Sequence, residues 1–268
     1  MSYLDSRIII LNSEHGIQNN GSYKSDILFK FQGLLTQEND IEQVQISLVS
    51  AQIPVSFYTI NYTNNMFKIE ITTLKLLTIP VGNYNANSLI TILNTLIDDS
   101  NLSISISRIT GKLKFSHNKD FIIYTDNEYS IGLILGFELN NTYNSSVGLL
   151  YATFPLNLLG YKRLEIYTQG LQTYNYSSLN NGGMNCLLAI IPIDQPSFVL
   201  ISYNNFTDTK HVINNTILDC IDIHIRGEDE NYINFNNIDW TMKLKLDITR
   251  KKPLEIINNN SNLSTVNN

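Results

Sequence analysis

The residues that could support catalysis are few, and they lie far apart in the sequence. Each of the four histidines stands in its own local context: His15, His117, His211 and His224. His224 alternates with isoleucines in a strand-like pattern, so we expect it on the polar face, as a surface or interface histidine. The sequence contains no G-x-S-x-G, H-E-x-x-H, phosphate-loop or dinucleotide motif. It therefore predicts no catalytic residues and a protein that is not an enzyme.

The two cysteines, Cys186 and Cys220, are the remaining candidate nucleophiles, and both occur in apolar stretches. The opening MSYLDSRIIILNSEHG has only a short apolar core, so we expect no secretory signal and a compartment that keeps thiols reduced. We therefore expect both cysteines to be buried small hydrophobes in strand interiors rather than a disulfide. A Cys–His nucleophile built on either cysteine stays open as an alternative, which alanine replacement of both would test.

Metal-binding patterns are equally sparse. The densest acidic cluster, Glu228 with Asp229 and Glu230, lacks the Asp-x-Asn-x-Asp-Gly spacing of a calcium loop. The cysteines form no C-x-x-C pair for zinc. We expect the acidic cluster to be a solvated turn between strands, and we predict no metal site and no cofactor.

Charge and hydropathy narrow the range of partners. The 268 residues carry 18 Lys+Arg against 24 Asp+Glu, a net charge of −6, whereas proteins that bind nucleic acids by their phosphates are usually basic. The one dense basic cluster, Arg250 with Lys251 and Lys252, is expected to be a solvated charge group after the last strand. The apolar runs are far shorter than the ~20 residues of a membrane span. We expect neither direct nucleic-acid binding nor a membrane span.

Tyrosine is abundant, with 15 residues, and it often stands beside asparagine. The tyrosines in this setting are Tyr62, Tyr84, Tyr143, Tyr174, Tyr176 and Tyr203. Amphipathic aromatic rings with amide neighbours suit protein–protein contacts or stacking on sugars. Chance pairing in an asparagine-rich chain is an equally good interpretation.

Alternating hydropathy predicts the elements that would position these residues. In DWTMKLKLDI, one face of a strand carries apolar residues only: Trp240, Met242, Leu244, Leu246 and Ile248. The same period predicts strands over 7–11, 26–31, 44–48, 66–72, 74–79, 162–167, 186–193, 198–203 and 221–225. Segments 103–109 and 112–116 are predicted to form a hairpin through Thr110-Gly111. Many short strands with polar turns indicate an all-β protein, an antiparallel β-sandwich with one or two short helices.

One segment has a helical period instead. The spacing of its apolar residues predicts a helix of about three turns with Asn87 or Ser88 as the N-cap: Leu89, Ile92, Leu93, Leu96 and Ile97. The stretch 131–137 fits a second helical turn or a strand equally well. Residues 140–147 are either a long surface loop or a boundary between two β-rich halves. Residues 254–268 lose all periodicity, which predicts a flexible Asn-rich tail.

Several blocks, taken in order, resemble the penton (minor capsid) proteins of virophages, Polinton-like viruses and related large DNA viruses. The blocks are RIIILNSEHG, VQISLVSAQIPVSFYTINYTNNMFKI, IPVGNYNANSLITILN, ISRITGKLKFS, IGLILGF and IHIRGEDENYINFNNIDWTMKLKLDI. Their order and spacing from Arg7 to Ile248 carry the resemblance more than any single block does. Residues 141–198 contribute no matching block.

The resemblance implies a single jelly-roll capsid domain over residues 1–253, with room for an inserted subdomain within 141–198. It also implies a structural virion protein that forms homopentamers at icosahedral five-fold vertices beside the major capsid protein. Such a protein would have no small-molecule substrate, and it would be synthesised in the host cytoplasm or viral factory. Two alternatives remain: a β-sandwich receptor- or carbohydrate-binding module, and an enzyme that uses Cys186 or Cys220.

Overall fold

The structure of the chain is a computed structural model, and it describes residues 2–19, 23–36, 38–171, 175–176, 183–184, 186–213 and 218–251. The predicted tail, 254–268, and Tyr174 lie outside the described residues. For Tyr176, the structure describes the backbone alone.

Two five-stranded antiparallel sheets form the larger part of the molecule. The first contains, in spatial order, β1 (Ser2–Asn12), β19 (Thr241–Lys251), β4 (Ile41–Pro54) and β16 (Leu200–Asn204), with β17 (His211–Val212) also paired to β4. The second contains β15 (Leu187–Pro192), β12 (Arg163–Tyr167), β18 (Leu218–Arg226), β3 (Asp26–Leu35) and β2 (Ile17–Gln18).

The connectivity of the eight main strands is that of a jelly-roll. In chain order these strands are β1, β3, β4, β12, β15, β16, β18 and β19. Successive strands alternate between the two sheets, except that β12 and β15 both lie in the second sheet. The first and last strands, β1 and β19, lie side by side, as do β3 and β18. This interleaving of two Greek keys defines the fold. The predicted all-β fold class, an antiparallel sandwich with a single jelly-roll, is confirmed.

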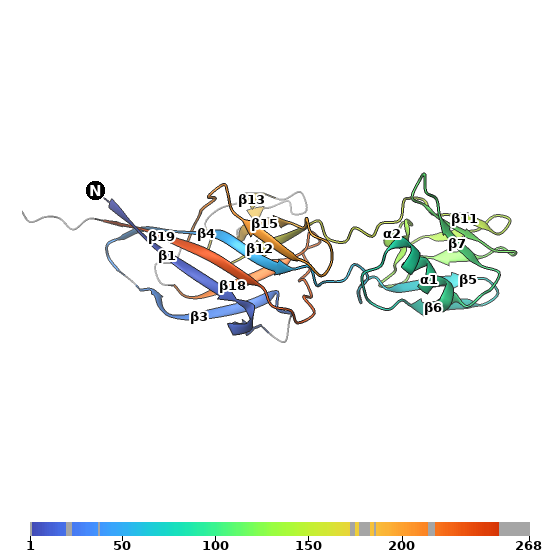
Figure 1. Ribbon diagram of the computed structural model, residues 1–268, viewed down its shortest axis with the longest axis horizontal. Coiled ribbons are helices and arrows are strands. Elements are labelled where there is room, and N and C mark those ends of the chain that lie inside the picture. Colours follow the sequence, from blue (N-terminus) through green and yellow to red (C-terminus); the bar gives the residue numbers. More distant parts are fainter. Residues whose placement is uncertain are drawn as a thin grey trace, which may run out of the picture.

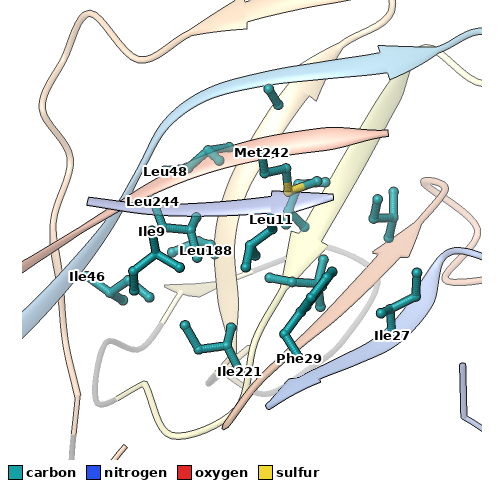
Figure 2. Packing of buried hydrophobic residues seen from close by; sticks show 14 of the residues in the cluster. Ile9, Leu11, Ile27, Phe29, Ile46, Leu48, Leu188, Ile221, Met242 and Leu244 are labelled. Carbon is teal, nitrogen blue, oxygen red and sulfur yellow. The ribbon is translucent and has the colours of Figure 1, made fainter. Parts of the chain in front are cut away.

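The core of the sandwich lies between the inward faces of the two sheets. All five apolar residues predicted for the inner face of 240–248 are at most 2% exposed, and Trp240 is the largest of them. Figure 2 shows Ile9 and Leu11 of β1 packed with Met242 and Leu244 of β19, facing Phe29 and Ile221 of the opposite sheet. The Phe29 and Trp240 rings meet edge to face with centroids 6.0 Å apart. The period-two pattern therefore identified the buried face correctly.

A second hydrophobic cluster is built entirely by residues between β4 and β12. One of its sheets contains β10 (Thr142–Asn144), β9 (Ile122–Tyr124), β5 (Met66–Glu70) and β6 (Leu74–Thr78). The other contains β11 (Leu149–Tyr151), β8 (Leu113–Ser116) and β7 (Ser103–Ile106), where β7 and β8 form the predicted hairpin. Helices α1 (Ala86–Ile97) and α2 (Gly132–Leu135) complete it. Figure 1 shows these elements grouped at one end of the long axis, away from the N-terminus.

The two clusters have no residue in common, and the chain passes between them near Phe57 and near Tyr161. We call the larger group of strands the sandwich and the group over 60–158 the inserted lobe. The range 141–198, in which we expected an inserted subdomain, is divided: residues to Leu158 pack in the lobe, and those from Tyr161 pack in the sandwich.

The predicted helix forms as α1, but it begins earlier than expected. Asn85, rather than Asn87 or Ser88, is the N-cap: its side chain accepts the Ser88 main-chain N–H at 2.9 Å, and the Ser88 hydroxyl accepts the Asn85 N–H at 3.0 Å. This reciprocal capping box satisfies two main-chain donors at once. Leu89, Leu93 and Ile97 form the buried face. Of the two interpretations of 131–137, the structure has the helical turn, α2.

Three short elements complete the described chain. They are the 3₁₀ turn Ser13–His15, β13 (Asn175–Tyr176) and β14 (Gly183–Met184), of which the last two pair with each other.

Candidate functional site

The four histidines are distributed over the whole molecule. His15 is exposed in the 3₁₀ turn, and His117 is buried in the inserted lobe just after β8. His211 is buried on β17, and His224 lies on β18. Within the described residues, no hydrogen bond or ion pair joins any histidine to a cysteine or to a second histidine. The described chain thus holds no Cys–His pair that could act as nucleophile and base.

His224 is the centre of a polar network on the outward face of the second sheet, the face that its alternation predicted. Its Nδ1 lies 3.0 Å from Asp26 Oδ1 on β3, and its Nε2 lies 2.9 Å from Asp222 Oδ2 on β18. The Tyr232 hydroxyl lies 3.2 Å from the same Nδ1 and accepts a hydrogen bond from Arg226. The His224 side chain is 17% exposed, so the network is largely screened from solvent.

The pKa values in this network favour an ion pair. The hydrogen bond that His224 donates to Asp222 raises the pKa of His224 above its usual value. The charges of Asp222 and Asp26 add to this effect, and burial opposes it. Burial would raise the pKa of Asp222, but hydrogen bonds from His224 and from the Gln169 N–H outweigh it and lower that pKa. Each polar group is held by its neighbours, which is typical of a structural network that fixes strands β3 and β18 together.

The cysteines do not lie where we predicted. Cys220 is exposed on β18, because it points to the outward face, and Cys186 is half-buried in the turn before β15. The apolar residues around them misled the prediction: Ile221 and Leu188 contribute to the core, whereas Cys220 alternates to the outward face and Cys186 precedes the strand. Both are free, and burial is the main cause that raises the pKa of each thiol, which disfavours the thiolate.

The basic cluster at the end of β19 is not a solvated group. Arg250 is 6% exposed and forms ion pairs with Glu38 and Asp40, which lie just before β4. Lys251 is exposed, and Lys252 lies outside the described residues. The guanidinium thus closes one end of the sandwich and offers no surface to a polyanion.

The acidic cluster lies beside a cleft at the junction of the sandwich and the inserted lobe. Glu228 and Asp229 line this cleft, and the Tyr161 hydroxyl donates to Asp229 Oδ2 at 3.0 Å. Asn231 Nδ2 donates to the same oxygen at 3.0 Å, which gives the turn that we expected. The described residues contain no group of three or more histidine, cysteine or acidic side chains placed to hold a metal ion.

The cleft has two connected parts, which together we call the waist cleft. One encloses about 530 Å³ and the other about 320 Å³. Both are lined by Phe57, Tyr58, Asn61, Thr63 and Tyr161, so they form a continuous groove. Two connecting segments join the sandwich to the lobe, the first near Phe57 and the second near Tyr161. Residues from the sandwich, the lobe and both connecting segments form the walls of the cleft.

Hydrogen bonds hold the first connecting segment from both sides. From the lobe, Asn83 Oδ1 accepts the Thr59 N–H at 2.7 Å and Asn83 Nδ2 donates to the Phe57 carbonyl at 3.2 Å. From the sandwich, Ser56 Oγ donates to the Phe235 carbonyl at 2.7 Å. The Phe57 ring packs edge to face against Tyr161 and Phe235, at 6.0 and 6.3 Å. The geometry of the cleft is therefore fixed by the fold.

Large apolar side chains are also exposed on the sandwich. Leu4, Ile8 and Ile10, which are 53–74% exposed, lie on one face of β1, an edge strand of 11 residues. Long edge strands with apolar faces are available for contacts with other protein chains. No described helix has the length and hydropathy to cross a membrane.

Comparison with known proteins shows similarity in structure alone. No family model matches the chain, and no curated protein matches its sequence. The crystal structure of the mavirus penton protein superposes with a TM-score of 0.50 at 11% identity, over 90% of this chain and 99% of that one. The two chains share a fold. This confirms, at the level of the fold, the resemblance inferred from the sequence blocks.

A second solved structure, the Sputnik virophage determined by cryo-EM, gives a TM-score of 0.43 at 11% identity. It covers 92% of this chain and 98% of that one.

Sequence reasoning did not find the waist cleft. Most of its lining residues come from segments around 55–64, 157–161, 193–197 and 228–236, which no local motif connects. The signal that was present is the pairing of tyrosine with asparagine, seen at Asn61-Tyr62 and again at Asn231-Tyr232. The topology brings these two pairs to one cleft. Other such pairs, at Tyr143 and Tyr203, lie elsewhere.

Proposed function

We propose that the protein is a structural component of a virion, a penton that forms homopentamers at the five-fold vertices of an icosahedral capsid. The observation that carries the proposal is the eight-stranded jelly-roll, together with a likeness to the mavirus penton protein that extends over nearly the whole of both chains. The coverage is important, because it includes the inserted lobe as well as the sandwich.

The surface of the sandwich supports a role in assembly. A ring of identical subunits joins two different patches of each chain and closes on itself, which requires exposed area suited to protein contact. The apolar face of β1, an edge strand of the sandwich, supplies such area. The outer rim of the ring would contact the major capsid protein of the same virion. This contact would hold the ring at the capsid vertex.

Two features support a non-enzymatic role without direct nucleic-acid binding. The described cysteines and histidines form no nucleophile–base pair, and burial raises the pKa of both thiols. The chain has a net charge of −6, and its buried arginine at the end of β19 is already paired with carboxylates.

We also propose a domain division that differs from the range first expected for an insertion. The two separate cores support a jelly-roll domain formed by residues to Phe57 and from Tyr161, with the inserted lobe, 60–158, as a second domain. Residues 254–268 remain proposed as a flexible tail.

The mass of the purified protein in solution tests the assembly, followed by class averages of negatively stained particles. We expect a species near five times 30.5 kDa with five-fold averages. A monomer at every concentration, both alone and when mixed with the major capsid protein, would contradict the pentamer.

A further inference from the structure

The waist cleft has the size and the fixed walls of a ligand-binding site. Its two parts, of about 530 and 320 Å³, fall within the roughly 300–1,000 Å³ that small-ligand sites occupy. The hydrogen bonds of Asn83 and Ser56 hold the segment that forms its floor. A ligand would therefore meet a site that needs little reorganisation on binding.

The lining of the smaller part combines aromatic rings with amides. Aromatic residues contribute six of its lining side chains: Tyr23, Phe57, Tyr58, Tyr62, Tyr161 and Tyr232. Four asparagines accompany them: Asn61, Asn231, Asn234 and Asn236. Aromatic faces pack against the C–H surface of a sugar ring, and an amide presents both a donor and an acceptor to neighbouring hydroxyl groups.

Several of these polar groups have capacity left for a ligand. Asn234 uses its oxygen to accept the Asn236 N–H, and Asn236 uses its nitrogen to reach the Ser56 carbonyl. The Asn234 nitrogen, the Asn236 oxygen and the hydroxyls of Tyr58 and Tyr62 take part in no hydrogen bond with another described residue. Tyr62 is 71% exposed, so its ring is open to a partner.

The charge of the cleft selects among possible ligands. Among the described residues that line it there is no lysine, arginine or histidine, and the larger part carries the carboxylates of Glu228 and Asp229. Phosphate, sulfate and sialic acid groups would therefore be repelled, whereas sugar hydroxyls can donate to the carboxylates. The site fits a neutral polyhydroxylated ligand.

We propose that the waist cleft binds a neutral oligosaccharide, with Tyr58 and Tyr62 as stacking platforms and the asparagines as hydrogen-bonding partners. The contacts come from one chain, so the site is complete in a single copy and does not depend on the proposed pentamer. On a capsid vertex, such a site would allow the particle to attach to glycans.

The full-length protein, labelled with a fluorophore, would be incubated with a printed array of neutral, sialylated and sulfated oligosaccharides. We expect binding to one or more neutral glycans and none to their sialylated or sulfated forms. An array without bound neutral glycans, or binding restricted to anionic glycans, would overturn the proposal.

Titration calorimetry with the strongest neutral glycan would then locate the site. We expect Tyr58→Ala and Tyr62→Ala each to weaken binding about tenfold, as the loss of one aromatic contact predicts. Tyr151→Ala is the matched control, because Tyr151 is 57% exposed on β11 and does not line the cleft. Unchanged affinity in Tyr62→Ala, with circular dichroism showing both variants folded, would place the sugar elsewhere and refute the proposal.

Discussion

At Trp240, a single side chain joins segments that are more than 200 residues apart in the sequence. The indole Nε1 donates to the Lys24 carbonyl at 2.6 Å, and the Trp240 N–H donates to Ser13 Oγ at 3.0 Å. The preceding residue, Asp239, accepts from the same Ser13 hydroxyl and pairs with Lys24 Nζ, both at 2.6 Å. The motif Asn237-Ile238-Asp239-Trp240 thus ties the start of β19 to the turns after β1 and before β3.

Replacing this tryptophan should therefore be costly. We expect Trp240→Ala to reduce the free energy of unfolding by about 3–5 kcal/mol, through the lost contacts and the cavity that remains. Chemical denaturation followed by fluorescence of a labelled chain, or by circular dichroism, measures the change. Lys243→Ala is the control, since Lys243 is exposed on the outward face of the same strand and should change stability by less than about 0.5 kcal/mol. Equal effects in the two variants would contradict the assignment of the inner face.

His224 gives a pH dependence with a defined sign. Its pKa is raised in the folded protein, so its ion pairs with Asp222 and Asp26 stabilise the fold fully below about pH 6.5, the pKa of an unfolded histidine. This stabilisation is lost as the pH rises through the higher folded pKa. Asp222 has a lowered pKa and stays ionised throughout this range.

We therefore expect the difference in unfolding free energy between the wild type and His224→Asn to be larger near pH 6 than near pH 9. Denaturant titrations of both proteins at the two pH values provide the measurement. A difference that is constant, or larger at about pH 9, would mean that His224 is neutral in the fold.

Among the elements, α1 allows the clearest test of a local signal. Asn85→Ala removes the side chain that accepts the Ser88 N–H and leaves a helical donor without its partner. We expect a loss of about 1 kcal/mol in the stability of the inserted lobe, measured by thermal unfolding. Asn87→Ala, one of the positions where the sequence pattern suggested a cap, is exposed and should have little effect. A larger loss in Asn87→Ala than in Asn85→Ala would indicate that the helix is capped at the position predicted from the sequence.

Most elements could be predicted because each has a local hydropathy period, and β19, β18 and the β7–β8 hairpin are clear examples. The start of α1 was missed because Asn85, Asn87 and Ser88 are all acceptable caps, and only the backbone geometry chooses among them. The thiol of Cys220 was misplaced because a buried sheet face contributes apolar neighbours to both sides of an outward-facing residue. Arg250 was misplaced because its partners, Glu38 and Asp40, are paired with it only by the strand register.

The inserted lobe and the waist cleft were beyond local reasoning for a different reason. The lobe consists of short amphipathic strands like those of the sandwich, so composition and period do not change where the chain leaves β4 or enters β12. The cleft depends on where several separate segments meet in space.

For the molecule as a whole, two separate cores predict two unfolding events. The rings of Phe57 and Tyr161, where the chain leaves and re-enters the sandwich, have centroids 6.0 Å apart, so a short linker can bridge the gap. We expect a variant in which a short Gly-Ser linker replaces residues 59–159 to keep the sandwich folded and unfold in one transition. Calorimetry of the intact protein should show the same transition of the sandwich and a second transition, that of the inserted lobe.

The assignment of the transitions has its own control. Trp240→Ala should lower the midpoint of the transition that persists in the shortened variant and leave the other unchanged, because Trp240 packs only in the sandwich core. A shortened variant that is unfolded, or a single transition in the intact chain that shifts as a whole in Trp240→Ala, would show that the two cores fold as one unit.

The full-length pairing of β1 with β19 has a practical consequence. Ser2 lies opposite Lys251, so the described chain begins and finishes at the same place, and Figure 1 shows that place at the end of the long axis away from the inserted lobe. The molecule is therefore a directional scaffold. A reporter fused through the N-terminal end would be carried at the pole opposite the inserted lobe, free of steric conflict with it.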